Sequence, residues 1–362
     1  TNARVSIAET VIRTRSTANG ISDREIEERT WRELDRFITR AISKNCLGLS
    51  CPQACAFSNY VASQLRKDLA PESDASDSHL DSQLPEITRY EKEMGYFFVE
   101  HLGLIYEHLV AHELHIKNDL VLLRINGAKK DSGVYYTPSD ATEFMCARAL
   151  GPIWRDHLRR KRECRRGGRC RNEGEEWTET PYRIVDIAAG SGQFPSQASR
   201  LIRKWYRHSS GYRSSNVEPL RDVSIITSHI FAADIDVRAV GYGCIELLVQ
   251  CVGNIHTDLN KSKAAFDQIR QNWFVGDSLI AVCAASVCAR GEGTAKMPST
   301  WRDFDAVIGN PPYRRLTDSE REMYRGFGYE CVGDSDVYSL FVEAALNLVS
   351  KGGGKVVQVV PL

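Results

Sequence analysis

The most constraining feature of the chain is an apolar stretch that runs directly into a glycine-rich turn. Residues 182–187 have the pattern of a short buried strand, and the turn Ala-Ala-Gly-Ser-Gly-Gln-Phe follows at 188–194. Apolar side chains then recur on one helical face, at Phe194, Ala198, Leu201, Ile202 and Trp205. A strand, a glycine turn and a helix in this order begin an open nucleotide-binding sheet. The sequence therefore predicts a Rossmann-like α/β fold.

The glycine turn also narrows the choice of cofactor. Pro195 stands where the dinucleotide-binding fingerprint needs its third glycine, which argues against NAD and FAD. The chain contains no G-x-x-x-x-G-K-[ST] motif, so a P-loop is excluded. The remaining common occupant of such a turn is S-adenosylmethionine (SAM), whose amino-acid end could meet Asp186 and the glycine backbone.

A second feature is the run Asn310-Pro311-Pro312-Tyr313, which follows the apolar stretch 304–309. Proline fixes φ and has no N–H to donate, so nearby carbonyl groups stay free to accept hydrogen bonds. The side-chain oxygen of Asn310 and the carbonyl of Pro311 could accept both hydrogens of an exocyclic amino group such as that of adenine. Tyr313 could stack on the base, a contact worth roughly 1–3 kcal/mol. The alternative is a proline-stiffened turn that ends a strand.

Together these motifs resemble those of the gamma-type N6-adenine DNA methyltransferases. Residues 186–194 are similar to the family's D-x-A-x-G-S-G-x-F motif, and residues 310–313 to its catalytic N-P-P-Y. Residues 133–138 resemble the G-x-Y-Y-T-P segment that the family places near the methionine end of SAM. Further motifs, at 101–107 and 336–361, resemble the large type IIG restriction–modification enzymes. The resemblance covers about residues 102–362, with its motifs in the family's order.

The resemblance implies a role for each motif residue. The implied catalytic positions are Asn310, Pro311, Pro312 and Tyr313, and no metal is implied. The positions implied to bind SAM are Tyr136, Thr137, Pro138, Asp186, Ala188, Gly190, Gly192, Phe194, Asp234, Asp277 and Asn310. We expect SAM to lie across the carboxyl ends of the strands, next to a flipped adenine.

The acidic positions have alternatives. Asp234 ends a strand pattern where the family places the carboxylate that accepts the ribose hydroxyls of SAM. Asp236 is the fallback, because the sequence separation from Asp186 exceeds the ~20 residues typical of such sites. Asp277 resembles the residue that accepts from the adenine amino group of SAM. Each aspartate could instead cap a helix or form a turn.

Two regions are expected along the chain. Residues 1–120 are predicted to be helical, with a linker near 71–85 that is rich in Ser and Asp, and residues 121–362 form the catalytic domain. Helices are expected over 21–42 and, as a pair, over 87–115.

Three histidines of the second helix pair would share one polar face: His108, His112 and His115. The catalytic sheet is expected to be incomplete at its C-terminal edge, since the family continues with two more strands and a target-recognition domain. The chain by itself is therefore expected to bind SAM weakly or to aggregate through an open strand edge, and to methylate DNA undetectably.

The composition of the chain limits which other classes of protein it can belong to. Lys plus Arg and Asp plus Glu both number 47, so the formal net charge is zero. Arginines are nevertheless concentrated in an insertion at 155–171, which we expect to be flexible and either to contact phosphates or to pair with the glutamates that follow. The eleven cysteines have no zinc-site spacing, which favours buried or free thiols. No apolar run approaches the ~20 residues of a membrane span, so a soluble, cytoplasmic enzyme is expected.

The leading hypothesis is a site-specific DNA methyltransferase that transfers a methyl group from SAM to N6 of a flipped adenine, in restriction–modification or phage defence. Its expected partners are double-stranded DNA and, in the rest of a longer protein or as separate subunits, nuclease and target-recognition modules. No membrane partner is expected. The alternatives are an RNA or protein-glutamine amino-methyltransferase, and a non-catalytic DNA-binding or SAM-sensing subunit of a defence complex.

Overall fold

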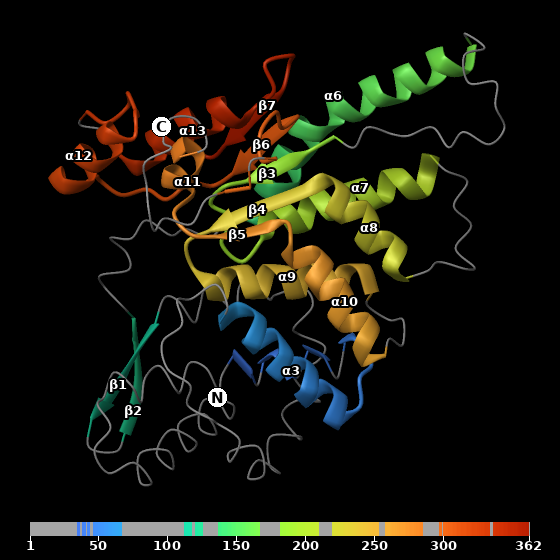
Figure 1. Ribbon diagram of the computed structural model, residues 1–362, viewed down its shortest axis with the longest axis vertical. Helices are drawn as coiled ribbons and strands as arrows, with labels where there is room; N and C mark the ends of the chain where they lie inside the picture. Colours follow the sequence, from blue (N-terminus) through green and yellow to red (C-terminus); the bar gives the residue numbers. More distant parts are fainter. Residues whose placement is uncertain are drawn as a thin grey trace. The chain divides into compact units, whose positions relative to one another are not determined.

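A computed structural model gives the fold of the chain (Figure 1). It describes residues 35–66 without 37, 41, 44 and 45, and 112–117, 120–125, 137–166, 182–209, 219–252, 258–284, 297–298, 300–333 and 336–361. Two compact units are present. The first comprises Thr1–Asp131 and Leu248–Asp267, and the second comprises Ser132–Leu247 and Gln268–Leu362.

The second unit is built on a parallel five-stranded sheet of order β5-β4-β3-β6-β7. The strands are β3 (Ile184–Asp186), β4 (Ile230–Asp234), β5 (Trp273–Val275), β6 (Ala306–Gly309) and β7 (Lys355–Gln358). In the register, Ile184 lies opposite both Ile230 and Ala306. Every residue of β3 and β6 is buried, as expected for central strands of a parallel sheet that is covered on both faces. The predicted α/β sheet is confirmed.

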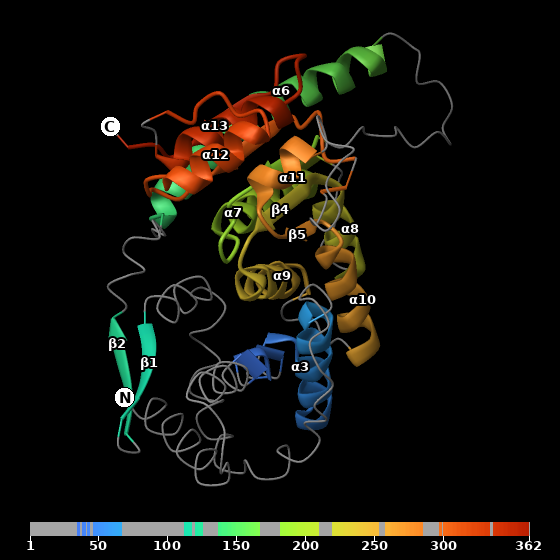
Figure 2. The same cartoon turned by 60° about the vertical axis from the view of Figure 1, so that its left-hand side comes forward.

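Helices follow the strands in alternation. They are α6 (Ser139–Arg166), α7 (Gln193–Ser209), α8 (Pro219–His229), α9 (Val237–Val252), α10 (Leu259–Arg270), α11 (Ser278–Ala284), α12 (Asp318–Gly326) and α13 (Val337–Leu348). Figure 2 shows α11, α12 and α13 gathered beside one another. The C-terminal end of α9 and α10 up to Asp267 fall within the first unit.

The two faces of the sheet carry different helices. Val185 of β3 and Val307 of β6 belong to one buried cluster with apolar residues of α11 and α13. Since alternate residues of a strand point to opposite faces, Ile184 and Asp186 face the other side, where α6 packs on β6 and α7 packs on β3. One buried apolar cluster therefore lies between the strands and the α11–α13 layer.

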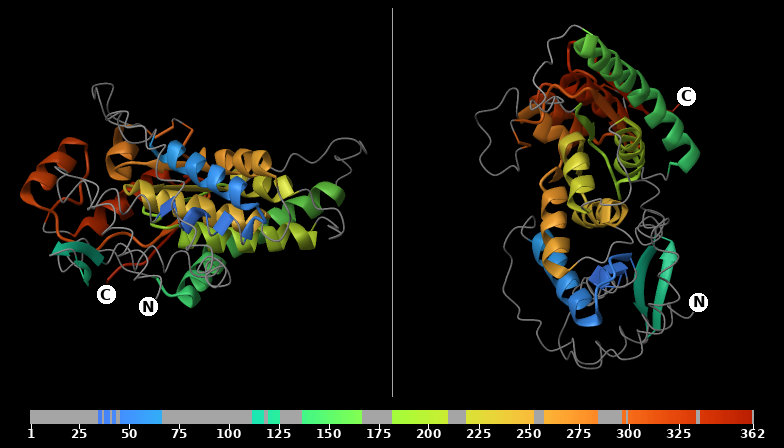
Figure 3. Two further views of the ribbon diagram at one scale, coloured as in Figure 1. Left: turned by 90° about the horizontal axis from the view of Figure 1, so that it is seen from below. Right: turned by 90° about the vertical axis from the view of Figure 1, so that its right-hand side faces the viewer.

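Helix α6 differs from the flexible insertion that was expected at 155–171. The helix continues through Arg166, and its C-terminal half extends away from the sheet in each view (Figure 3). The residues there are good helix formers, and Arg159 pairs with both Asp156 and Glu163 one turn away on the same face. The expectation of a flexible segment is therefore wrong up to Arg166, and residues 167–171 lie outside the described ranges.

In the first unit, helix α3 (Cys51–Arg66) contacts the Leu248–Asp267 segment. Phe57 meets Phe266 edge to face, with ring centroids 6.1 Å apart, and the hydroxyl of Tyr60 hydrogen-bonds the carboxylate of Asp267. Of the helix predicted over 21–42, the described residues from 35 onward are helical.

The first unit also holds a β-hairpin where a helix was expected. Strands β1 (His112–Lys117) and β2 (Leu120–Ile125) pair antiparallel, so His112 and His115 lie on a strand. The prediction of a helix reaching residue 115 is wrong, because the Asn118-Asp119 pair between two apolar-containing runs is typical of a turn. His108 and the expected linker at 71–85 lie outside the described residues.

Within the described ranges, no helix has the length and apolarity that crossing a membrane requires. The same residues contain no group of three or more His, Cys, Asp or Glu side chains that could hold a metal ion. The described cysteines with placed side chains form no disulfide; they are Cys46, Cys55, Cys146, Cys244, Cys251, Cys283 and Cys331.

Candidate cofactor and base site

Four polar side chains stand where neighbouring strands of the sheet end. Asp186 is the last residue of β3 and Asp234 the last of β4, while Asp277 and Asn310 follow β5 and β6. The order β5-β4-β3-β6 places these strand ends side by side. The carboxyl edge of an open parallel sheet is where such folds bind ligands, so this row is the candidate site.

The glycine turn between β3 and α7 has a backbone that only glycine adopts readily. Gly190 and Gly192 have φ of 54° and 90°, in the left-handed region. A Cβ on Gly192 would also lie 2.9 Å from the ring of Trp273 and 3.1 Å from the Cα of Gly243. Gly192 therefore permits both the turn and the close approach of α9 and β5.

Asp234 ties this turn to the end of β4. Its Oδ2 accepts the N–H of Gly190 at 2.7 Å, and its Oδ1 accepts the N–H of Asp236 at 2.8 Å. Burial raises the pKa of the Asp234 carboxyl from 3.8 to about 6, although these N–H groups act in the opposite direction. Asp236 instead accepts the N–H of Arg238 at the start of α9, which is a helix-capping contact.

Asp186 is a buried carboxyl with an unsatisfied oxygen. Its Oδ1 accepts the N–H of Ala188 at 3.0 Å, while Oδ2 is buried and has no hydrogen-bond partner among the described residues. Burial raises the pKa of this carboxyl from 3.8 to about 8. A buried acceptor left unpaired costs free energy, so this oxygen is suited to a cationic or hydrogen-donating group of a ligand.

The carboxyl of Asp186 leaves no room for a side chain at position 309, which is a glycine. A Cβ there would lie 2.5 Å from Oδ1 of Asp186, so the end of β6 approaches β3 too closely for any side chain. Asn310 is the next residue. The strand end that leads into Asn310 therefore lies against the carboxyl of Asp186.

Asn310 is held at both ends of its amide. Its Nδ2 donates to Oγ1 of Thr137 at 2.9 Å, and its Oδ1 accepts the hydroxyl of Tyr313. The same hydroxyl lies 2.9 Å from the carbonyl oxygen of Val359. The ring of Tyr313 meets that of Tyr338 edge to face, and burial raises the pKa of Tyr313 to about 12. The phenol is therefore neutral at physiological pH.

Asp277 caps a helix, which is the alternative that the sequence left open beside its cofactor role. Its Oδ1 accepts the N–H groups of Leu279 and Ile280 at 2.9 and 3.1 Å, at the start of α11. Its Oδ2 accepts the hydroxyl of Tyr324 at 2.9 Å. The cap uses one oxygen only, and Oδ2 keeps a lone pair that can accept a second donor beside the Tyr324 hydroxyl.

The structure brings most of the sequence-predicted residues to this edge. Thr137 is buried against Asn310, and Phe194 is buried at the start of α7. Pro138 is exposed, and its carbonyl accepts the N–H of Thr142 in the first turn of α6. Tyr136 lies outside the described residues.

Sequence reasoning missed two contributors, Gly309 and Tyr324. No local pattern marks either, because each acts through a contact with a residue that is distant in the chain. The helix that carries Tyr324 does have a local signal, since Thr317 and Glu320 fit the capping-box pattern S/T-x-x-E.

One family model matches the C-terminal part of the chain. Residues 228–361 match the family model described as Eco57I restriction-modification methylase. This stretch contains Asp234, Asp277 and the Asn310-Pro311-Pro312-Tyr313 run. A search of curated proteins finds no match to the chain.

Several solved structures are similar to the chain at low identity. A nuclease-deletion mutant of the Type ISP restriction-modification enzyme LlaGI, in complex with a DNA substrate mimic, is 14% identical with a TM-score of 0.43, and the match covers 96% of this chain and 32% of that one. The DrdV–DNA complex is 16% identical with a TM-score of 0.40, covering 93% and 33%. The ATP-dependent Type ISP enzyme LlaBIII bound to DNA is 12% identical with a TM-score of 0.47, covering 95% and 23%. The chain thus spans a third or less of each of these proteins.

Proposed function

We propose that this chain, which carries a restriction–modification methylase domain over residues 228–361, is the catalytic part of a site-specific DNA methyltransferase acting on N6 of a flipped adenine. One juxtaposition carries the proposal. Asn310, whose amide oxygen is an acceptor suited to an amino group, directly follows Gly309, where a Cβ would lie 2.5 Å from Oδ1 of the Asp186 carboxyl. The other oxygen of that buried carboxyl has no partner and is suited to a cation. An acceptor for the nucleophile and a carboxyl for a charged methyl donor therefore stand at the ends of two adjacent strands.

The residues at the strand ends fit SAM. Asp186 would pair with its ammonium group through the oxygen that now has no partner. Asp234 would accept the ribose hydroxyls with the lone pairs that its two backbone contacts leave free. Asp277 would accept from the adenine amino group. When bound there, SAM supplies an electrophilic methyl group, and no metal is needed.

Residues Asn310–Tyr313, which we call the base cup, would activate a poor nucleophile. The lone pair of the adenine amino nitrogen is delocalised into the ring, and acceptors for both of its hydrogens favour the pyramidal form. Asn310 Oδ1 and the Pro311 carbonyl would be these acceptors. With both hydrogens held in this way, the amino nitrogen would be positioned to accept the methyl group that SAM supplies when bound, and one amino proton would pass to water. Positioning and hydrogen bonds would supply the rate gain.

Tyr313 must release Asn310 before adenine can bind. The phenol has one proton, and two acceptors lie within its reach, Asn310 Oδ1 and the carbonyl oxygen of Val359. The hydroxyl can therefore turn to Val359 without losing its hydrogen bond, which leaves the amide oxygen to the base. The ring would stack on the flipped adenine and offset part of the few kcal/mol that flipping costs.

Double-stranded DNA is the partner that we propose, because residues 228–361 match a restriction-modification methylase family model. Nuclease and target-recognition modules would come from other parts of a longer protein or from separate subunits. The side chains of Arg155 and Arg162 are exposed on α6 and would meet phosphates, while Arg159 pairs with two carboxylates.

Methylome sequencing tests the proposal. The complete protein would be expressed in a host without adenine methylation of its own, beside an Asn310→Ala control. N6-methyladenine at one defined motif in the wild-type host, absent with Asn310→Ala, is the expected result. Unmethylated DNA together with methylated RNA or glutamine would favour the amino-methyltransferase alternative, and no methylation of any kind would favour a non-catalytic subunit.

A further inference from the structure

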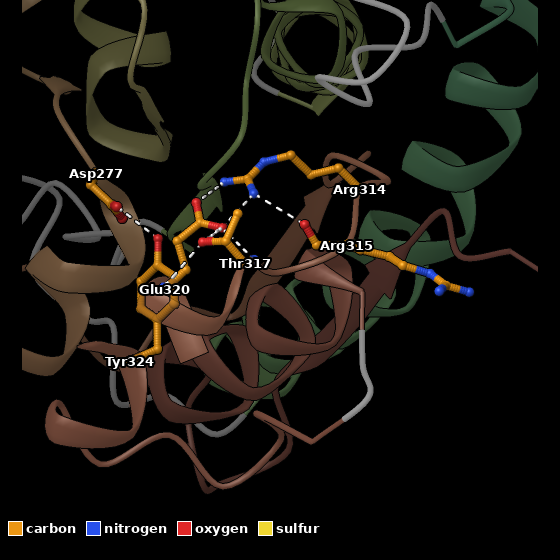
Figure 4. Close-up of polar contacts among 6 residues, drawn as sticks. All are labelled: Asp277, Arg314, Arg315, Thr317, Glu320 and Tyr324. Carbon is orange, nitrogen blue, oxygen red and sulfur yellow. Dashed lines mark hydrogen bonds and ion pairs between the residues drawn. The ribbon is translucent and has the colours of Figure 1, made fainter. Parts of the chain in front are cut away.

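The segment directly after the base cup is locked by an ion pair and a helix cap (Figure 4). Arg314 donates from both terminal nitrogens to the carboxylate of Glu320, at 2.9 and 2.7 Å. Glu320 also accepts from the backbone N–H of Thr317, whose hydroxyl in turn accepts the N–H of Glu320. The pairing with Arg314 lowers the pKa of Glu320 to about 2. Helix α12 is therefore fixed to the residue that follows Tyr313.

The far end of α12 reaches the opposite side of the candidate site. Tyr324 is buried, and its ring meets Tyr329 edge to face at 5.9 Å. Its hydroxyl donates to Oδ2 of Asp277 at 2.9 Å. The segment 314–324 thus joins the base cup after β6 to the aspartate after β5, which lies at the other edge of the row of strand ends.

The carboxylate of Asp277 has little rotational freedom left. Two backbone N–H groups hold Oδ1, and the Tyr324 hydroxyl holds Oδ2 from one side. Without the hydroxyl, only the Oδ1 contacts would define the carboxylate plane. The remaining lone pair of Oδ2 then has one direction, and it can accept from one further donor.

We propose that Tyr324 is a positioning residue for Asp277 that sets the selectivity of the cofactor site for a 6-amino purine. This inference rests on the proposed function, because it assumes that Asp277 faces the purine of SAM. An Oδ2 that the Tyr324 hydroxyl occupies on one side can accept a hydrogen bond from an amino group on the other, whereas it would repel an oxo group at the same place. Removing the Tyr324 hydroxyl should therefore change which purine is bound more than it changes the fold.

Two ligands that differ only at the 6-position of the purine test this. They are S-adenosylhomocysteine, which has a 6-amino group, and S-inosylhomocysteine, which has a 6-oxo group. Calorimetry on the complete protein should show that the wild type prefers the amino ligand roughly 10–100-fold, the range expected for a hydrogen bond to a charged acceptor. In Tyr324→Phe this preference should fall to about a fifth, with the affinity for the oxo ligand nearly unchanged.

Tyr329→Phe is the matched control. It also removes one buried hydroxyl, but that hydroxyl donates to the Leu279 carbonyl at 2.7 Å and not to the Asp277 carboxylate. It should leave the preference for the amino ligand unchanged. If Tyr324→Phe does not fold, Glu320→Gln loosens the same helix at a partly exposed position and should lower the preference about threefold.

The outcomes separate this inference from the function on which it rests. A wild type that binds neither ligand contradicts the proposed function and the inference together. A wild type that prefers the amino ligand, with the same preference in Tyr324→Phe, leaves SAM binding intact and overturns the role of Tyr324. Equal losses in Tyr324→Phe and Tyr329→Phe would likewise reduce Tyr324 to a packing role.

Discussion

The side-chain amide of Asn310 donates to the hydroxyl of Thr137 at 2.9 Å, and 173 positions of sequence separate the two residues. Thr137 is buried just before α6, so the start of that helix sets its position, and the base cup does not. This contact, together with the Tyr313 hydroxyl on the other side of the amide, defines which way the acceptor oxygen of Asn310 faces. A residue implied to bind the cofactor thus also orients the proposed catalytic amide.

Replacing Thr137 with valine should lower the methyl-transfer rate. The isosteric change removes the partner of Asn310 Nδ2, and the loss of one hydrogen bond of ~1–1.5 kcal/mol corresponds to a roughly tenfold lower kcat. Thr137→Ser, which keeps the hydroxyl, should recover most of the rate. Single-turnover kinetics with saturating SAM would show this, and equal rates in the valine and serine variants would remove the orienting role.

Replacing Asn310 should separate chemistry from cofactor binding. Asn310→Ala is expected to keep its affinity for SAM and to lose methyl transfer, because the lost acceptor matters only when adenine is present. Tyr313→Ala should impair capture of the base, and Tyr313→Phe should be milder because the ring can still stack. Calorimetry with SAM and base-flipping fluorescence would measure the two effects. Equal weakening of SAM binding in all three variants would mean that the loop shapes the cofactor site instead.

Asp234 and Asp236 should differ in their effect on SAM. Asp234→Ala removes a carboxylate that also accepts the N–H of Gly190, so it should weaken SAM binding at least tenfold, in line with the ~1.5–3 kcal/mol of a charge-assisted hydrogen bond. Asp236→Ala removes a capping contact at α9 and should leave SAM affinity within about threefold. The reverse ranking in calorimetry would transfer the ribose role to Asp236.

The stability of the ligand-free protein should fall as pH rises. The pKa of Asp186 is raised from 3.8 to about 8 in the folded state, so the folded protein holds a proton that the unfolded chain releases. That contribution is complete below pH ~4 and is lost as pH rises through about 8. Asp234, raised to about 6, acts with the same sign at lower pH. Thermal unfolding between pH ~5 and ~8.5 should show the decline, and Asp186→Asn should flatten its upper part. A profile that is identical in both proteins would show that Asp186 ionises normally.

Local patterns in the sequence predicted the parts of the fold that local chemistry determines. The strand, glycine turn and helix from residue 182 onward need only short-range periodicity and two glycines with positive φ. The positions of Asp234 and Asn310 at strand ends follow from where apolar runs stop. The parallel register of β4 and β6 with β3 then places both residues at the same edge of the sheet.

The predictions that failed concern segments whose structure depends on contacts beyond the local sequence pattern. A helix is predicted up to His115, where the first strand of the hairpin lies, because short apolar runs fit either period. Residues 155–171 are predicted to form a flexible insertion, although the residues up to Arg166 favour helix and Arg159 pairs with Glu163 along it. The contact between Tyr324 and Asp277 joins residues 47 positions apart, so only the packing of α12 could reveal it.

The most direct test of the central claim is the identity of the nucleoside that receives the methyl group. The complete protein would be incubated with isotope-labelled SAM and a duplex library, and the digested nucleosides would be measured by mass spectrometry, with Asn310→Ala in parallel. We predict label in N6-methyldeoxyadenosine alone, and none with Asn310→Ala. Label in N4-methyldeoxycytidine, or equal label in both proteins, would contradict an adenine site built on Asn310.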